Sequence, residues 1–278
     1  MLTLYFSATG NTKYIADLFS SEMGVACLSI EDDKNFTEEN KSHDVIAFCY
    51  PVYASRVPRI MREFVAKHMS DLNGKKIIIL VTQMMFSGDG ARVFTDMFWD
   101  NAIEVVYAEH FNMPHNVGNI PILWKPSDRA IKRCIKKTNI KMMRICRDIK
   151  NGVVKKRGFS RFSSFLGSIQ GKLWQGSSKE INPGVSTIEE RVKNGVKIHK
   201  ECTVCYLCVS ICPMKNLVCE KRNGVENDKR CKESNRAMEI VPQGNCIVCY
   251  RCVNRCPQKA ITVMMVHIRP KWQYMMKF

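Results

Sequence analysis

The chain has 278 residues, which is long for one domain and comfortable for two. Its 45% hydrophobic and 25% charged content is typical of a globular protein and argues against global disorder. No stretch approaches the roughly 18 uninterrupted apolar residues that a membrane span needs, and the opening residues lack the basic leader of a signal peptide. We therefore expect a cytoplasmic globular protein.

The 14 cysteines argue against a disulfide framework, because a chain without an export signal stays where thiols are kept reduced. Ten of them lie beyond residue 200, and eight of those ten form two matching runs. We expect these eight to be metal ligands. Four others are scattered through the first 150 residues. We expect Cys27 and Cys49 on strands and Cys134 and Cys146 on the apolar side of a helix, where a cysteine behaves as a small hydrophobe.

The net charge of +17 is distributed unevenly along the chain. Residues 1–124 carry 10 Lys and Arg against 15 Asp and Glu, and residues 125–200 carry 20 against 5. A very basic middle thus follows an acidic head. Because no recognised nucleic-acid module accompanies this charge, we expect no nucleic-acid binding.

The first half alternates buried strands with helices. Apolar runs at residues 1–6, 45–49, 77–81 and 105–108 read as strands, and helical patterns follow the first three of them. Continuous β-branched runs alternating with helices predict a parallel sheet that is covered on both faces, a doubly wound α/β domain. Ligands of such sheets bind beyond the carboxyl ends of the strands.

The loop Ser7-Ala8-Thr9-Gly10-Asn11-Thr12 places hydroxyls and a glycine at the start of the first helix. Backbone N–H groups and the helix dipole favour a phosphate there. The loop has no Lys and no Gly-Lys-Ser/Thr ending, so it is not the P-loop of a nucleoside-triphosphate site. A monophosphate held without a counter-cation suits FMN, although a well-capped helix explains the same residues.

The loop resembles the first loop of flavodoxins, which has the form Ser/Thr-x-Thr-Gly-x-Thr. Residues 51–58 look like the flavodoxin loop that places an aromatic ring over the isoalloxazine, and residues 82–90 resemble the loop that holds its other edge. Over roughly residues 1–150, the resemblance implies a flavodoxin-like, doubly wound, five-stranded parallel sheet that binds FMN. The implied FMN contacts are Ser7, Thr9, Gly10, Asn11, Thr12, Pro51, Tyr53, Thr82, Phe86, Gly88 and Gly90.

The strongest signal is a duplicated run in the C-terminal part, Cys202–Pro213 and Cys246–Pro257, with the spacing C-x2-C-x2-C-x3-C-P. This spacing resembles that of bacterial two-cluster ferredoxins, in which the fourth cysteine of each run ligates the other cluster. The resemblance implies two [4Fe–4S] clusters in a small α+β domain. Their ligands would be Cys202, Cys205, Cys208 and Cys256 for the first cluster, and Cys246, Cys249, Cys252 and Cys212 for the second.

Two alternatives and one departure accompany this interpretation. Structural zinc would use pairs of cysteines and leaves the third spacing and the repeated Cys-Pro unexplained. Tyr206 and Tyr250 stand where ferredoxin motifs commonly have glycine, which puts the redox potentials of the family in doubt. Cys219 and Cys231, between the runs, could ligate something else but read as a strand residue and a loop residue.

The basic middle begins with a helix that Ser127 caps and that runs to about residue 151. Residues 152–198 then form a basic connector with an aromatic-rich amphipathic helix, between a domain at 1–151 and one at 199–278. We expect an acidic redox partner to dock on the basic region 125–200. Contact of the connector with a membrane surface is the less favoured alternative.

The whole arrangement resembles bacterial flavodoxin–ferredoxin fusion proteins, often labelled "ferrodoxin", and implies electron transfer. The favoured mechanism relays electrons between the clusters and FMN, which couples one-electron to two-electron partners. The alternative is an enzyme that reduces a small acceptor such as a quinone, nitro compound or enone, with His115 as a proton donor. No dinucleotide fingerprint is present, so no NAD(P) site is expected.

Overall fold

The computed structural model describes residues 1–53, 56–85, 89–98, 102–175, 194–221, 238–264 and 267–277. The chain divides into two compact units. The first comprises Met1–His115, Pro126–Thr187 and Met276–Phe278, and the second comprises Asn116–Lys125 and Ile188–Met275. Most of the connector expected at residues 152–198 therefore belongs to the first unit.

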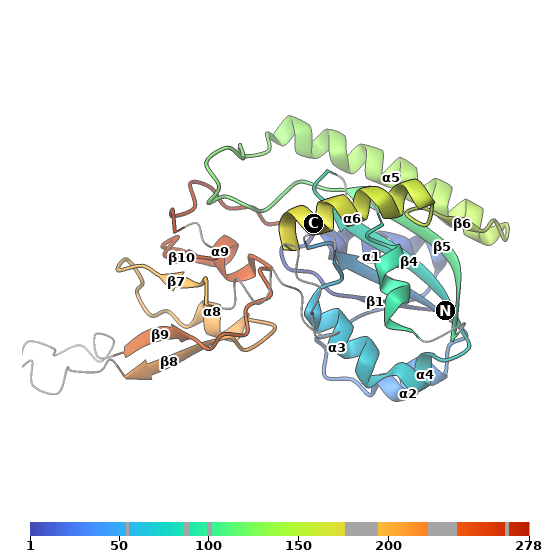
Figure 1. The fold of residues 1–278 in the computed structure, drawn as a ribbon, viewed down its shortest axis with the longest axis horizontal. Coiled ribbons are helices and arrows are strands. Elements are labelled where there is room, and N and C mark those ends of the chain that lie inside the picture. The colour runs from blue at the N-terminus through green and yellow to red at the C-terminus, as the bar shows by residue number, and fades with distance from the viewer. Residues whose placement is uncertain are drawn as a thin grey trace, which may run out of the picture. The chain divides into compact units, whose positions relative to one another are not determined.

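The first unit contains a parallel sheet of six strands in the order β2-β1-β3-β4-β5-β6 (Figure 1). Strands β1, β3 and β4 are buried along most of their length, as expected for apolar runs that are covered on both faces. The α/β prediction is confirmed, and the strand order is that of the flavodoxin fold. The strands are β1 Leu2–Tyr5, β2 Ala26–Ser29, β3 Val45–Pro51, β4 Lys75–Gln83, β5 Ile103–Asn112 and β6 Lys155–Lys156.

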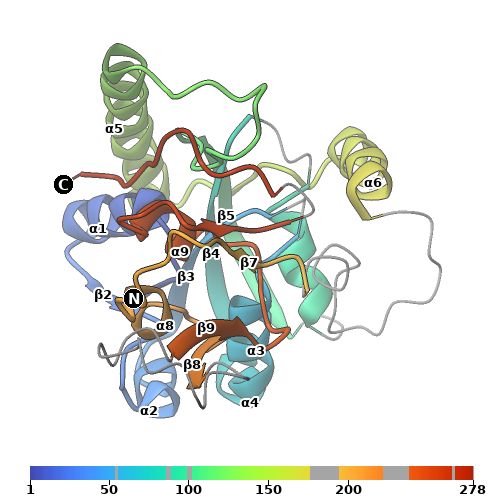
Figure 2. The ribbon, with the colours of Figure 1, turned by 90° about the vertical axis from the view of Figure 1, so that its left-hand side faces the viewer.

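Helices cover both faces of this sheet. Helices α1 and α5 pack against each other on one face, where Tyr14 donates a hydrogen bond of 2.6 Å to Asn139, and α3 and α4 lie on the other face (Figure 2). The predicted cap of α5 is confirmed, since the Ser127 hydroxyl accepts the N–H of Ala130. The helices are α1 Asn11–Met23, α2 Phe36–Lys41, α3 Arg59–Lys67, α4 Met69–Leu72, the 3-10 helix η1 Arg92–Met97, α5 Asp128–Lys150 and α6 Arg161–Gln175.

The sixth strand, β6, was not expected from the sequence, and the buried carboxylate of Glu109 explains it. The side chain of Glu109 is 1% exposed and accepts hydrogen bonds from Arg157 (3.0 Å) and Lys155 (3.4 Å), with Lys141 at 3.1 Å. Burial alone would raise the pKa of Glu109, but the N–H of His110 and these cations hold it below its usual value. A buried charge needs such partners, so Glu109 attaches a Lys-Lys-Arg segment to the sheet edge.

Helix α6 is the aromatic-rich amphipathic helix that the connector predicts. Its Gly167 is buried, and a Cβ atom there would clash with the carboxylate of Asp89, so glycine allows this close approach to the loop after β4. Phe162, Phe165 and Ile169 are exposed. Among the described residues, no helix is both long and apolar enough to cross a bilayer.

The second unit is smaller and contains short antiparallel strands. Its buried residues, among them Leu217, Ile240 and Val253, form a core that includes several of the cysteines. Strand β7 pairs with β10, and β8 pairs with β9. The elements are β7 Lys197–Ile198, α8 Leu207–Ser210, β8 Leu217–Lys221, β9 Met238–Pro242, α9 Arg251–Arg255 and β10 Ile261–Thr262.

Candidate functional site

The first candidate site lies in the first unit, where residues 7–12 connect the end of β1 to α1. Gly10 is the N-cap of α1 and has φ of +100°, a backbone conformation that glycine adopts without steric cost. Thr9 and Thr12 are buried beside it, and no side chain caps the helix. The positive end of the α1 dipole and the hydroxyls of this loop therefore favour an anion.

The loops after β1, β3 and β4 meet at the carboxyl edge of the sheet. Thr12 Oγ1 lies 2.7 Å from Thr82 Oγ1, and the N–H of Val52 donates to the carbonyl of Thr82 at 2.8 Å. The register of β3 and β4 also pairs Pro51 with Thr82. The structure thus brings together three of the residues that the sequence assigned to the flavin site, each from a different loop.

In the second loop, Tyr53 and Arg56 are joined by two backbone hydrogen bonds. The N–H of Tyr53 donates to the carbonyl of Arg56 at 3.1 Å, and the N–H of Arg56 donates back to Tyr53 at 2.9 Å. Tyr53 is half-buried and Arg56 is exposed. These bonds hold the backbone of an aromatic residue beside the carboxyl end of β3.

The third loop is anchored at both ends. Gln83 Nε2 donates to Asn112 Oδ1 at 2.7 Å, and the buried Gly90 accepts a hydrogen bond of 3.0 Å from Tyr50 through its carbonyl. The two other candidate contacts in this loop, Phe86 and Gly88, lie outside the described residues. The ends of the loop are therefore positioned by strands β3 and β5.

Asp89 and Arg92 balance each other's charge in this loop. The Asp89 carboxylate is buried and accepts hydrogen bonds from Arg92 Nη2 at 2.7 Å and Nε at 3.1 Å. Burial would lower the pKa of Arg92, but Asp89 raises it above its usual value. The single carboxylate of the three loops thus contributes little net charge to the site.

Two residues that the sequence did not indicate, Pro114 and Met276, form hydrogen bonds with the first loop. Asn11 Nδ2 donates to the carbonyl of Pro114 at 2.7 Å, which fixes the segment that leads to His115. The N–H of Met276 donates to the carbonyl of Thr9 at 2.8 Å. Both contacts join segments more than 100 residues apart, so no local pattern could have indicated them.

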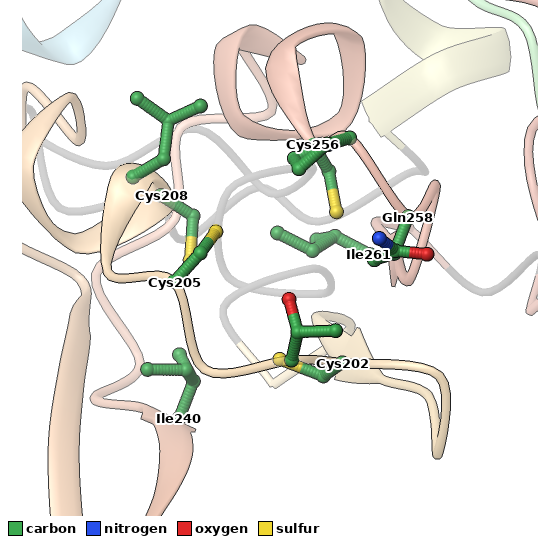
Figure 3. Close-up of a pocket in the computed structure, with 10 residues that line it drawn as sticks. Cys202, Cys205, Cys208, Ile240, Cys256, Gln258 and Ile261 are labelled. Atoms are coloured by element: carbon green, nitrogen blue, oxygen red, sulfur yellow. The ribbon is translucent and has the colours of Figure 1, made fainter. Parts of the chain in front are cut away.

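The second candidate site comprises two small cavities in the second unit, with volumes of about 10 and 20 Å³. Figure 3 shows the first cavity, where Cys256 approaches three cysteines of the other run. Each cavity therefore takes three cysteines from one run and the fourth from the other. The first is lined by Cys202, Cys205, Cys208 and Cys256, and the second by Cys246, Cys249, Cys252 and Cys212.

The backbone of the two cysteine loops is duplicated in detail. Six residues other than glycine adopt positive φ at three pairs of equivalent positions, 44 residues apart, with values from +49° to +62°. Four backbone N–H groups, in two equivalent pairs, donate to cysteine sulfurs at 3.2–3.4 Å. The positive-φ pairs are Val204 and Val248, Tyr206 and Tyr250, and Lys215 and Lys259.

Burial strongly affects the thiols of both cavities. Burial, together with the charges of Cys202 and Cys256, raises the pKa of Cys208 to about 11. Burial likewise raises the pKa of Cys249 to about 12. Without a ligand these thiols are protonated at neutral pH, so they ionise only when a cation compensates the cost of burial.

The described thiols of each cavity do not converge on a single point. Among the residues that the structure describes, no three His, Cys, Asp or Glu side chains are close enough to hold one metal ion. Tetrahedral zinc would require four sulfurs at about 2.3 Å from one ion. Cys219 lies on β8 and lines neither cavity, and Cys231 lies outside the described residues.

Comparison with known proteins identifies the N-terminal half. Residues 2–118 match the family model of the flavodoxin domain. Similar solved structures include a flavodoxin from the domain Archaea, with 18% identity over 52% of this chain and 97% of that one and a TM-score of 0.32. The two-electron reduced flavodoxin of Megasphaera elsdenii shows 19% identity over 51% and 99%, with a TM-score of 0.36. The Trp repressor binding protein of Bacillus subtilis shows 11% identity over 52% and 96%, with a TM-score of 0.39.

A search of curated proteins gives no match. The match to the family model shows that the chain contains a flavodoxin-like domain in its N-terminal half. This domain class indicates a flavin-based redox role.

The duplicated loops allow a matched test of their strained backbone. Tyr206 and Tyr250 both have φ of +62°, and glycine would relieve about 1–2 kcal/mol at each position. Tyr206 is 45% exposed, so we expect Tyr206→Gly to leave hydrogen exchange of the second unit unchanged or slower. Tyr250 is 3% exposed, and Tyr250→Gly also removes packing worth about 3–5 kcal/mol, so exchange over residues 246–264 should accelerate at least tenfold. Equal acceleration in both variants would contradict this account.

Proposed function

We propose that this chain is an electron-transfer protein that holds FMN in its first unit and two [4Fe–4S] clusters in its second. The observation that carries the proposal is the exchange of cysteines between the two runs. Each cavity receives three thiols from one run and the fourth from the other. This is the ligand arrangement that the duplicated C-x2-C-x2-C-x3-C-P spacing implies.

The donor set fits clusters in two further ways. Thiolates are the ligands that iron–sulfur clusters require, and each cavity gathers four of them from the two runs. The backbone also donates to the sulfurs, as the N–H of Val204 does to Cys202 and the N–H of Val248 does to Cys246. Such hydrogen bonds stabilise negative charge on sulfur and help to set the redox potential. Each cluster, when bound, supplies one-electron chemistry.

The three loops of the first unit fit FMN. Ser7, Thr9 and Thr12 supply hydroxyls, and the turn at Gly10 supplies backbone amides for a phosphate at the start of α1. Tyr53 is the aromatic residue proposed to stack on the ring, with Phe86, Gly88 and Gly90 at its other edge. The match of residues 2–118 to the flavodoxin domain, which includes these loops, also supports this assignment. FMN, when bound, accepts one or two electrons.

With both kinds of cofactor in one chain, the protein would couple partners that exchange single electrons to partners that exchange pairs. The chain's own contribution is to hold the cofactors and set their electrostatics. The Asp89–Arg92 pair keeps the third flavin loop close to neutral, and backbone N–H groups stabilise the cluster sulfurs. The function that follows is an electron relay.

The proposed partner is an acidic redox protein that docks on α5. Eight Lys and Arg side chains of this helix are exposed, whereas Lys141 turns inward to Glu109. A concentrated positive field accelerates the approach of an acidic protein and is screened by salt. The exposed residues are Arg129, Lys132, Arg133, Lys136, Lys137, Arg144, Arg147 and Lys150.

Electron transfer from a small acidic ferredoxin to the loaded protein should therefore slow as ionic strength rises. Stopped-flow measurements at several salt concentrations test this, and we expect a fall of about tenfold or more. Reversing four charges on α5, at Lys132, Arg133, Lys136 and Lys137, should slow transfer at low salt and abolish most of its salt dependence. Salt-independent transfer in the unaltered protein would rule out docking on this helix.

Anaerobic analysis of iron, sulfide and flavin tests the cofactors themselves. We expect about eight irons, eight sulfides and one FMN per chain. Cys202→Ala and Cys256→Ala should each remove the same electron paramagnetic resonance signal, because both residues line the first cavity. Cys212→Ala should remove the other signal, because Cys212 lines the second cavity.

Cys219→Ala is the matched control, since Cys219 belongs to the second unit but lines neither cavity; its iron content should equal that of the unaltered protein. Bound zinc in place of iron would contradict the cluster proposal. Loss of different signals in Cys202→Ala and Cys256→Ala would contradict the proposed sharing of ligands. Clusters without flavin would leave the first unit without its proposed cofactor.

A further inference from the structure

The segment around Met276 is an integral part of the first loop. Met276 belongs to the first unit, is 6% exposed and donates its N–H to the carbonyl of Thr9 at 2.8 Å. A Cβ atom on Gly10 would lie 2.7 Å from Met276 Cβ. Gly10 is therefore required both by its φ of +100° and by the close approach of Met276.

The hydrogen bond between Met276 and Thr9 also controls the direction in which the N–H of Gly10 points. The carbonyl of Thr9 and the N–H of Gly10 belong to one peptide unit, which is planar and trans, so they point in opposite directions. When Met276 holds the carbonyl oxygen, rotation of that peptide is restricted and the N–H of Gly10 is held on the opposite side. Gly10 is the N-cap of α1, where backbone N–H groups bind anions.

We propose that Met276 is a positioning residue for the flavin phosphate, acting through its backbone N–H. The inference rests on the proposed binding of FMN and adds a residue that lies 266 positions after Gly10 in the chain. The N–H of Met276 fixes the Thr9–Gly10 peptide, and this peptide presents the N–H of Gly10 to the phosphate. The Cβ atom of Met276 packs against Gly10, and the assigned role belongs to the backbone N–H.

The role predicts a selective effect on phosphate-bearing flavin. Met276→Pro removes the N–H, whereas Met276→Leu retains it with a side chain of similar volume. Fluorescence titration of the full-length protein with FMN and with riboflavin separates the phosphate from the ring. We expect Met276→Pro to raise the Kd for FMN by about three- to tenfold, as for the loss of one hydrogen bond, and to leave the Kd for riboflavin unchanged. Met276→Leu should bind both flavins as the unaltered protein does.

A second pair of variants serves if the proline variant does not fold. Deletion of residues 276–278 removes the N–H of Met276, and deletion of residues 277–278 retains it. Both deletions place a new carboxylate near the same position, so the two variants differ mainly in this N–H. Only the longer deletion should weaken FMN selectively. Equal FMN binding by the donor-free and donor-retaining variants, or an equal loss of both flavins, would overturn the positioning role alone. Failure of the unaltered protein to bind FMN would overturn the proposed flavin function and this inference with it.

Discussion

The left-handed backbone of the two cysteine loops is the constraint on which the second unit depends. Six residues with side chains adopt positive φ there, each at a cost of about 1–2 kcal/mol, and two of them are β-branched valines. The conformation turns backbone N–H groups toward cysteine sulfurs at equivalent positions of both loops. A strain of this size in a small unit requires compensation, which the binding of clusters would supply because metal binding and folding are coupled. Under the proposed function, such compensation would offset the strain of a tyrosine at the position where ferredoxin motifs commonly have glycine.

In the first unit, the parallel sheet is the feature that positions the residues of the candidate site. It brings three loops to one edge, where Thr12 and Thr82 meet directly. Gly10 starts α1 without a side-chain cap, and Met276 supports the loop from a distant part of the sequence. The loops thus offer hydroxyls, amides and an aromatic ring with little net charge, which suits a flavin monophosphate. The proposed electron relay would need the binding chemistry of both units.

The sequence predicted the chemistry of the sites better than their supports. The spacing of the two runs singled out the eight thiols, and the exchange of the fourth cysteine between runs came from the resemblance to two-cluster ferredoxins. Alternating apolar runs predicted the doubly wound sheet for the same local reason. Strand β6 was missed because its lysines carry no strand pattern and pair with β5 through the buried Glu109. The contacts of Pro114 and Met276 were missed because tertiary packing alone creates them.

The central claim is that electrons pass between clusters and flavin within one chain. Rapid mixing of the anaerobic, fully loaded protein with a one-electron donor, followed by absorbance of flavin and clusters, tests it most directly. The account predicts that the flavin is reduced after the clusters at a rate independent of protein concentration, and that Cys202→Ala, which removes a cluster ligand, slows this step. A flavin that stays oxidised beside reduced clusters, or a rate proportional to protein concentration, would contradict the relay.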